Sequence, residues 1–360
     1  MAAWKRKGEL SSFHEKLIEG MTSRGYTLDF AERIFRQIQG FGEYGFPESH
    51  AASFALLVYV SAWLKCHEPA AFLCAMLNSL PMGFYSASQL IQDAQRHGVQ
   101  VRPVDVTVSD WDCTLEEQAG DTQSAHPAVR LGLNRIKGLG LEAAKRIMNA
   151  RKTSPFESTN DLASRASLNT AEMRSLAHSD ALRALSGHRR QALWAVASYM
   201  KQLDLMRCAP VRETLPNIAA AREGEEITAD YVSTELTLRR HPLALLRPKL
   251  TRMNLHSAME LDNCPTGRLV RTTGIVTCRQ RPGTASGVVF VTLEDETGVT
   301  NVVVWSQLVR KQRREILNSR LLTVYGVWQR EGEVKHVIAK QLVDHSHLLG
   351  NLMVESRDFH

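Results

Sequence analysis

The sequence has 360 residues, a length that predicts two or three domains, with an ordinary globular composition of 44% hydrophobic and 23% charged residues. Its six cysteines form no C-x-x-C pair, which argues against a zinc ribbon and against a disulfide framework. The net charge of +6 is compatible with a nucleic-acid partner. No signal-peptide segment and no apolar run of transmembrane length is found, so we expect a cytoplasmic protein without a membrane partner.

Residues 1–40 have apolar side chains at helical spacing and predict two helices. The next stretch sets Gly40, Gly42 and Gly45 between aromatic residues. We expect a shaped loop there, because glycine takes positive φ and aromatic side chains anchor a loop to apolar surfaces.

A helix is predicted from Ala51 to Leu64, with Ser49 as its cap. It is apolar around most of its circumference, so we expect it inside a large core. His50 has two interpretations. It is either a buried, hydrogen-bonded histidine, or it faces a ligand at the helix N-terminus, where anions are favoured.

The residues of this region also resemble a known family. F-G-E-Y-G-F-P-E-S-H-A-A-S-F-A, followed by A-W-L-K-C-H-E-P-A-A-F-L, is similar to the fingers region of bacterial C-family DNA polymerases, relatives of the polymerase III alpha subunit. Replicative members read Asn-Lys where this chain has Pro47-Glu48, a difference that resembles the error-prone, ImuC-type branch. The resemblance implies damage-induced translesion synthesis, with Ser49 and His50 near the incoming nucleotide.

The resemblance further implies that this chain is the C-terminal portion of a longer polymerase, with Met1 an internal methionine. In the family, the palm and its catalytic aspartates lie upstream. The sequence has no strand-borne Asp-x-Asp with a third acidic partner, which a two-metal site would need. We therefore expect no catalytic residue, no metal and no bound cofactor in this chain, and magnesium in the complete enzyme.

A helix-hairpin-helix DNA-binding region is predicted over residues 128–206. In Ile136-Lys137-Gly138-Leu139-Gly140, the glycines let backbone amides approach a phosphate at the positive end of the following helix. The alternative is a purely structural αα-turn. The residues predicted to contact DNA are Lys137, Gly138, Gly140, Lys145 and Arg146.

A degenerate second copy is predicted from Thr159 to Arg190, with its turn near residues 178–180 and a packing role, since that turn lacks glycine. The trio His188-Arg189-Arg190 is either a patch that faces DNA or a solvated helix start.

A candidate clamp-binding peptide follows. The word QLDLM resembles the sliding-clamp peptides of polymerases, in which a glutamine and spaced apolar side chains enter a pocket; an amphipathic helix end is the alternative. The residues concerned are Gln202, Leu203, Leu205 and Met206.

The C-terminal part predicts an OB-fold at residues 267–345, because three strand-like runs, a helix and two further strands follow in that order. Arg279 and Arg281 lie in a loop that such folds use for nucleic acid, and we expect them to bind DNA. Trp305, Tyr325 and Trp328 either stack on bases or cap the barrel core.

The sequence thus predicts a multidomain α+β protein: a helical fingers-like region (1–105), a helix-hairpin-helix region (128–206), a connector (207–266), a β-barrel OB-fold (267–345) and a tail (346–360). The expected function is the DNA-binding part of an error-prone polymerase. The expected partners are primer-template and single-stranded DNA, the sliding clamp and an ImuB-type accessory protein. The alternative is a non-enzymatic DNA-binding adaptor.

Overall fold

A computed structural model describes residues 7–44, 48–82, 85–117, 126–197, 216, 218–282, 287–352 and 357–359, and only the backbone at 7–13, 38–44, 48–50 and 357–359. The chain divides into two compact units, residues 1–72 and 73–360. The described helices include none with both the length and the apolar character needed to cross a membrane.

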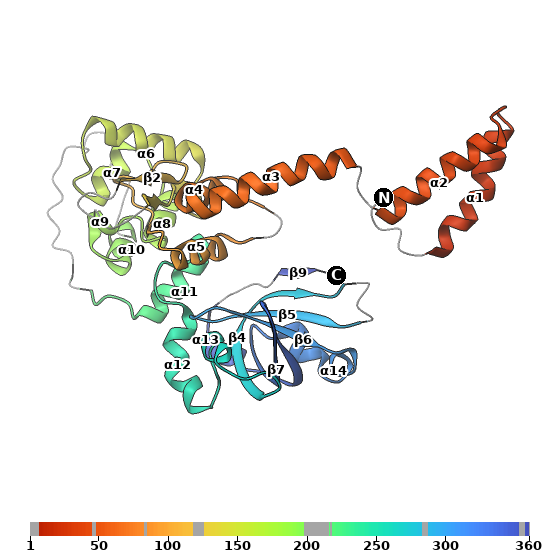
Figure 1. Cartoon of the computed structure of the whole chain (residues 1–360). Helices are drawn as coiled ribbons and strands as arrows, with labels where there is room; N and C mark the ends of the chain where they lie inside the picture. The colour runs from red at the N-terminus through yellow and green to blue at the C-terminus, as the bar shows by residue number, and fades with distance from the viewer. Residues whose placement is uncertain are drawn as a thin grey trace. The chain divides into compact units, whose positions relative to one another are not determined.

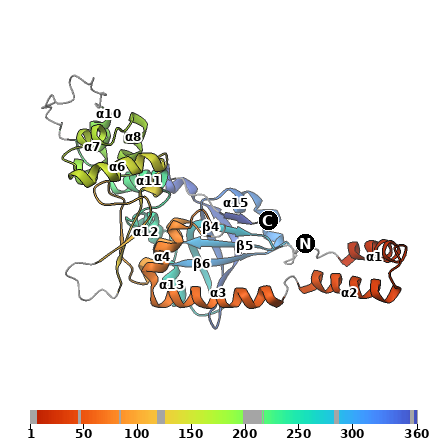
Figure 2. The same cartoon turned by 90° about the horizontal axis from the view of Figure 1, so that it is seen from above.

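The first unit is helical, as predicted. Helices α1 (Lys7–Thr22) and α2 (Leu28–Tyr44) lie side by side, and the rings of His14 and Phe35 meet edge to face at 4.4 Å (Figures 1 and 2). The predicted loop at Gly40 and Gly42 is wrong, because α2 continues through both residues. The apolar spacing that drives the helix persists there, and a glycine costs a helix only about 1 kcal/mol.

Helix α3 (Glu48–His67) confirms the predicted apolar helix but not its burial. Phe54, Tyr59 and Trp63 are 51%, 70% and 48% exposed. With these side chains exposed, α3 is not the buried core helix that its composition predicted. Helix α4 (Pro69–Asn78) follows.

The second unit begins with helices and a small three-stranded sheet. Across this sheet, Arg102 and Arg130 both contact the carboxylate of Glu116, which keeps the pKa of that carboxyl below its usual value. The elements are α5 (Ala87–Arg96), β1 (Val101–Arg102), β2 (Thr114–Glu116), β3 (Ala128–Arg130), η1 (Leu133–Arg135), α6 (Leu141–Thr153), α7 (Thr159–Arg165), α8 (Thr170–His178), α9 (Arg183–Ser186) and α10 (Arg189–Ala197). Their core includes Leu133, Ile147, Leu162, Met173 and Leu176.

Three helices connect this region to the barrel: α11 (Glu223–Thr234), α12 (Pro242–Arg252) and α13 (Ala258–Asp262). Arg247 of α12 contacts the carboxylates of Asp295 and Glu296 at the tip of a barrel hairpin. Leu243 and Leu250 of α12 join one apolar cluster with barrel residue Leu321. The connector is therefore packed onto the barrel.

The barrel has the strand order of an OB-fold. The elements are β4 (Leu269–Gln280), β5 (Val289–Glu294), β6 (Val299–Val304), α14 (Ser306–Lys311), α15 (Arg313–Asn318), β7 (Leu321–Glu331) and β8 (Val334–Asp344), followed by η3 (Ser346–Leu349) and β9 (Arg357–Phe359). The antiparallel pairs β4–β5, β5–β6, β7–β8 and β4–β7 and the parallel pair β6–β8 close the barrel. The predicted fold is thus confirmed.

Candidate nucleic-acid interface

The first hairpin presents an open helix N-terminus. Gly140 is the N-cap of α6, with φ −85° and ψ 157°, and it supplies no side chain to cap the helix. The amides of Leu141 and Glu142 find no protein acceptor within the described residues. A Cβ at Gly140 would meet no atom within 4 Å. Free amides at the positive end of a helix, with open space before them, make a site that suits an anion such as phosphate.

The turn before this helix is packed against the rest of the unit. Gly138 has φ +82°, and a Cβ there would lie 2.9 Å from the Ser175 hydroxyl on α8. The Lys137 amide donates to the carbonyl of Ser233, at the end of α11, over 2.9 Å. Gly138 therefore serves the structure of the turn, and Gly140 is the glycine that leaves room for a phosphate.

The basic side chains around the hairpin have carboxylate partners. Lys137 and Lys145 lie half exposed, 3.0 Å from Glu235 and 2.8 Å from Glu142. Such exposed pairs are weak, so both lysines remain available to DNA.

Arg146 has a different position. Its guanidinium contacts both oxygens of Glu172, at 2.9 and 3.0 Å, and donates to the carbonyl of Ala166. Arg146 therefore ties α6 to the second hairpin, and the expectation of a DNA contact is not supported at this residue.

The second hairpin repeats the geometry of the first but is already capped. Its turn joins α7 to α8 at residues 166–169, earlier than the predicted 178–180. Ser167, at φ +48°, takes the place of Gly138, and Asn169 takes the place of Gly140. The Asn169 side chain accepts from the Glu172 amide, and the Glu172 carboxylate accepts from the Asn169 amide. A capping box thus closes this helix N-terminus, in agreement with a packing role.

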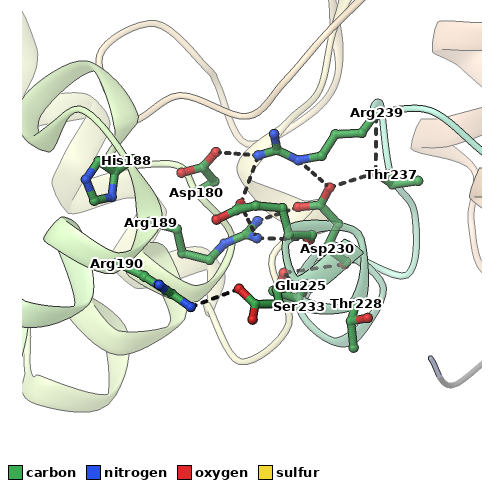
Figure 3. A network of polar contacts seen from close by, with 12 residues as sticks. Asp180, His188, Arg189, Arg190, Glu225, Thr228, Asp230, Ser233, Thr237 and Arg239 are labelled. Carbon is green, nitrogen blue, oxygen red and sulfur yellow. Dashed lines mark hydrogen bonds and ion pairs between the residues drawn. The ribbon is translucent and has the colours of Figure 1, made fainter. Parts of the chain in front are cut away.

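A buried ionic network holds α11 against the hairpin region (Figure 3). Arg189 of α10, with a side chain only 4% exposed, contacts the carboxylates of Glu226, at 2.6 Å, and Asp230. Arg239 reaches both of them and also Asp180, at 3.1 Å. Burial raises the pKa of Asp180, although the neighbouring arginines oppose this.

The network corrects both interpretations of the His188-Arg189-Arg190 trio at Arg189. Arg189 is neither on a DNA-facing patch nor solvated, and Arg190 pairs with Glu225 at 2.8 Å. His188 accepts from the Gln191 amide at the start of α10. The carbonyl of Ser233 on α11 accepts from the Lys137 amide in the turn of the first hairpin. The network that holds α11 therefore also helps to hold this turn in place.

The barrel presents an outward face on β5 and β6 that suits single strands. Phe290, 39% exposed, lies between its strand partners Gln280 and Val303. Trp305, 53% exposed, follows β6 directly. Aromatic rings on such a face can stack on bases. Arg281, directly after β4, is exposed, and its contact with DNA stays a prediction.

Arg279 is not available to DNA in this structure. It is 7% exposed, and its guanidinium donates to the carbonyls of Ile316 and Ser319. Trp328 is 3% exposed and belongs to the barrel core, so it does not stack on bases. The ring of Tyr325 is engaged by the Arg271 guanidinium, 5.4 Å from its centre.

Other predicted residues lie outside the part of the chain that the structure describes. The side chains of Ser49 and His50 and the whole of Gln202, Leu203, Leu205 and Met206 are not among the described residues. Within the part of the chain that is described, no three His, Cys, Asp or Glu side chains gather into a group that could hold a metal ion.

Comparison with known families finds two matches. The "Helix-hairpin-helix motif" family matches residues 98–192, and the "OB-fold nucleic acid binding domain" family matches residues 267–344. Both agree with the elements described above. The similarity to solved structures is slight: asparaginyl-tRNA synthetase from Pyrococcus horikoshii aligns with 22% of this chain and 20% of its own, at 22% identity and a TM-score of 0.19.

Curated proteins match the chain along its whole length. The chain is 58% identical to a protein of Azoarcus sp., 56% identical to one of Alkalilimnicola ehrlichii and 54% identical to one of Burkholderia pseudomallei, each named "Error-prone DNA polymerase". All of this chain is covered, but only 34% to 35% of each relative. The chain is therefore similar throughout to about one third of proteins named error-prone DNA polymerase, which confirms the resemblance found in the sequence.

Proposed function

We propose that this chain is the C-terminal, DNA-binding portion of an error-prone DNA polymerase that synthesises DNA across damaged templates. The contrast between the two hairpins carries the proposal. The N-terminus of α8 is closed by the capping box of Asn169 and Glu172, whereas the N-terminus of α6 begins at an uncapped glycine. A phosphate of the DNA backbone would occupy the open site, and its oxygens would accept hydrogen bonds from the free amides.

The barrel would hold the single-stranded part of the substrate. Phe290 and Trp305 offer apolar rings for stacking, and Arg281 offers charge beside them. The hairpin would hold the duplex part through its backbone, since phosphate contacts carry no sequence information. Together they would grip a primer-template junction of any sequence.

Catalysis would need the rest of the enzyme. The whole polymerase would use magnesium bound by residues outside this chain, with Ser49 and His50 beside the incoming nucleotide. We therefore expect the purified chain to bind a labelled primer-template in a fluorescence anisotropy titration but to extend no primer when magnesium and nucleotides are added. Template-dependent extension by the chain alone would contradict this division of labour.

The QLDLM segment would bind the sliding clamp, and an ImuB-type protein would be a second partner. We expect the double variant Gln202→Ala, Leu205→Ala to stop co-elution with the clamp while DNA affinity stays unchanged. The matched variant Gln191→Ala, which alters a glutamine on α10 instead, should still co-elute. If the double variant still co-elutes, the segment does not bind the clamp, and the alternative of an amphipathic helix end is the better interpretation.

A further inference from the structure

Four basic residues lie close together in sequence where α14 meets α15, on the part of the barrel that follows β6. Arg310, Lys311, Arg313 and Arg314, here called the helical basic cluster, are all exposed. None of them has an ion-pair partner among the described residues, and Glu315 is the acidic residue next to them in sequence. This cluster lies outside the β5–β6 face and outside the first hairpin.

The cluster differs from the arginines of the second unit that a carboxylate holds. Arg130, Arg146, Arg151, Arg165, Arg189 and Arg247 each have such a partner. Like charges within one or two helical turns repel one another. Four neighbouring cations without partners therefore weaken the fold slightly unless an external anion binds them.

Local helix stability does not account for all four cations. Arg310 and Lys311 lie in the last turn of α14, where the helix dipole favours positive charge. Arg313 and Arg314 lie in the first turn of α15, where the dipole disfavours it. The second pair thus destabilises the start of α15, and because both side chains are exposed, no burial compensates for that cost.

The backbone under the cluster is held firmly. The Gln312 side chain, between the two helices, donates to the Leu342 carbonyl over 2.7 Å and accepts from the Leu342 amide over 2.9 Å. Leu308, Val309 and Ile316 pack onto the barrel core. The basic side chains therefore extend from a fixed surface, which lowers the entropy lost when they bind a ligand.

We propose that the helical basic cluster is a second contact surface for the DNA backbone, which holds single-stranded DNA after it leaves the β5–β6 face. Arginine forks match phosphate oxygens, and exposed Trp305 lies in sequence between that face and the cluster. The inference rests on the proposed DNA-binding function and extends it to a longer strand.

The test compares two lengths of single-stranded DNA. Oligonucleotides of about 10 and about 40 nucleotides are titrated against wild type and against the variant Arg310→Gln, Lys311→Gln, Arg313→Gln, Arg314→Gln, because one OB-fold covers about 4 to 16 nucleotides. We expect the variant to bind the short strand like wild type. With the long strand, the slope of log K against log salt should become shallower by about 2 to 3, since each phosphate that the variant leaves unneutralised removes about 0.7.

Two control variants separate the cluster from net charge and from folding. Replacing Arg96, Lys152, Lys249 and Arg252 with glutamine removes the same charge from scattered exposed positions and should leave the slope for the long strand unchanged. Replacing the three cluster arginines with lysine keeps the charge and should restore most of the slope.

The possible outcomes are distinct. If wild type binds long strands and the cluster variant behaves like the scattered variant, the inference is overturned and an acidic protein partner becomes the better explanation of the cluster. If wild type binds no single strand of either length, the proposed function fails as well.

Discussion

Replacing Gly140 with asparagine should lower the affinity for duplex DNA about tenfold or more without unfolding the protein. The asparagine side chain would accept from the amide of Ala143, as the Asn169 side chain accepts from the amide of Glu172 in α8, and would occupy the space before the helix that the phosphate needs. Losing a hydrogen bond to a charged group costs about 1.5 to 3 kcal/mol. An asparagine N-cap is at least as good as glycine, so α6 should gain a few tenths of a kcal/mol.

The measurement is a fluorescence anisotropy titration with duplex DNA, together with hydrogen exchange of α6 to follow its stability. Gly98→Asn is the matched control, because Gly98 has φ +83°, which asparagine tolerates, and a Cβ there meets no atom within 4 Å. The variant Gly138→Val would be a poor test, because Gly138 has φ +82° and strain would confuse the result. Unchanged affinity in Gly140→Asn would leave the first hairpin as a packing element.

Replacing Arg189 with methionine should destabilise the hairpin region by about 3 to 5 kcal/mol, the cost of leaving buried carboxylates without a partner. Glu226 and Asp230 are 9% and 14% exposed, and Arg239 alone would remain to compensate them. Hydrogen exchange of α10 and α11 should become at least about a hundredfold faster, as that free energy implies.

Arg190→Met is the neighbouring control. Its ion pair with Glu225 is about half exposed, so its loss should cost under about 1 kcal/mol. The double variant Arg189→Met, Glu226→Leu should recover part of the loss, because a well-packed apolar pair can replace a buried ionic one. If the amides of α10 and α11 exchange at the same rate in Arg189→Met and in Arg190→Met, the network does not hold α11 in place.

Local patterns were sufficient to predict the barrel and the first hairpin. The strands of the OB-fold alternate inward and outward between clear turns, so their order could be predicted from periodicity. Gly138 and Gly140 marked the first hairpin. The second was predicted too late in the chain because Ser167 adopts positive φ without being glycine. The sequence nevertheless holds a pattern that could have placed the second turn correctly. Buried Ile147 follows Gly140 at the same interval at which buried Leu176 follows Asn169.

Contacts between residues far apart in sequence could not be predicted from local patterns. Arg189 looks like a surface residue in sequence, because its partners Glu226 and Asp230 lie far along the chain on another helix. Arg279 was expected in a loop, but β4 extends to Gln280, and a register shift between Val276 and Cys278 turns Arg279 inward. Apolar α3 was expected to be buried, but composition cannot specify which surface covers a helix.

The salt dependence of duplex binding tests the central claim most directly. We expect log K for the wild-type chain to fall steeply with log salt, by about 0.9 for each phosphate that the protein neutralises, and the slope for Gly140→Asn to be shallower by the equivalent of about one phosphate. A slope near zero for wild type, or equal slopes for both proteins, would contradict the proposal that the open N-terminus of α6 binds the DNA backbone.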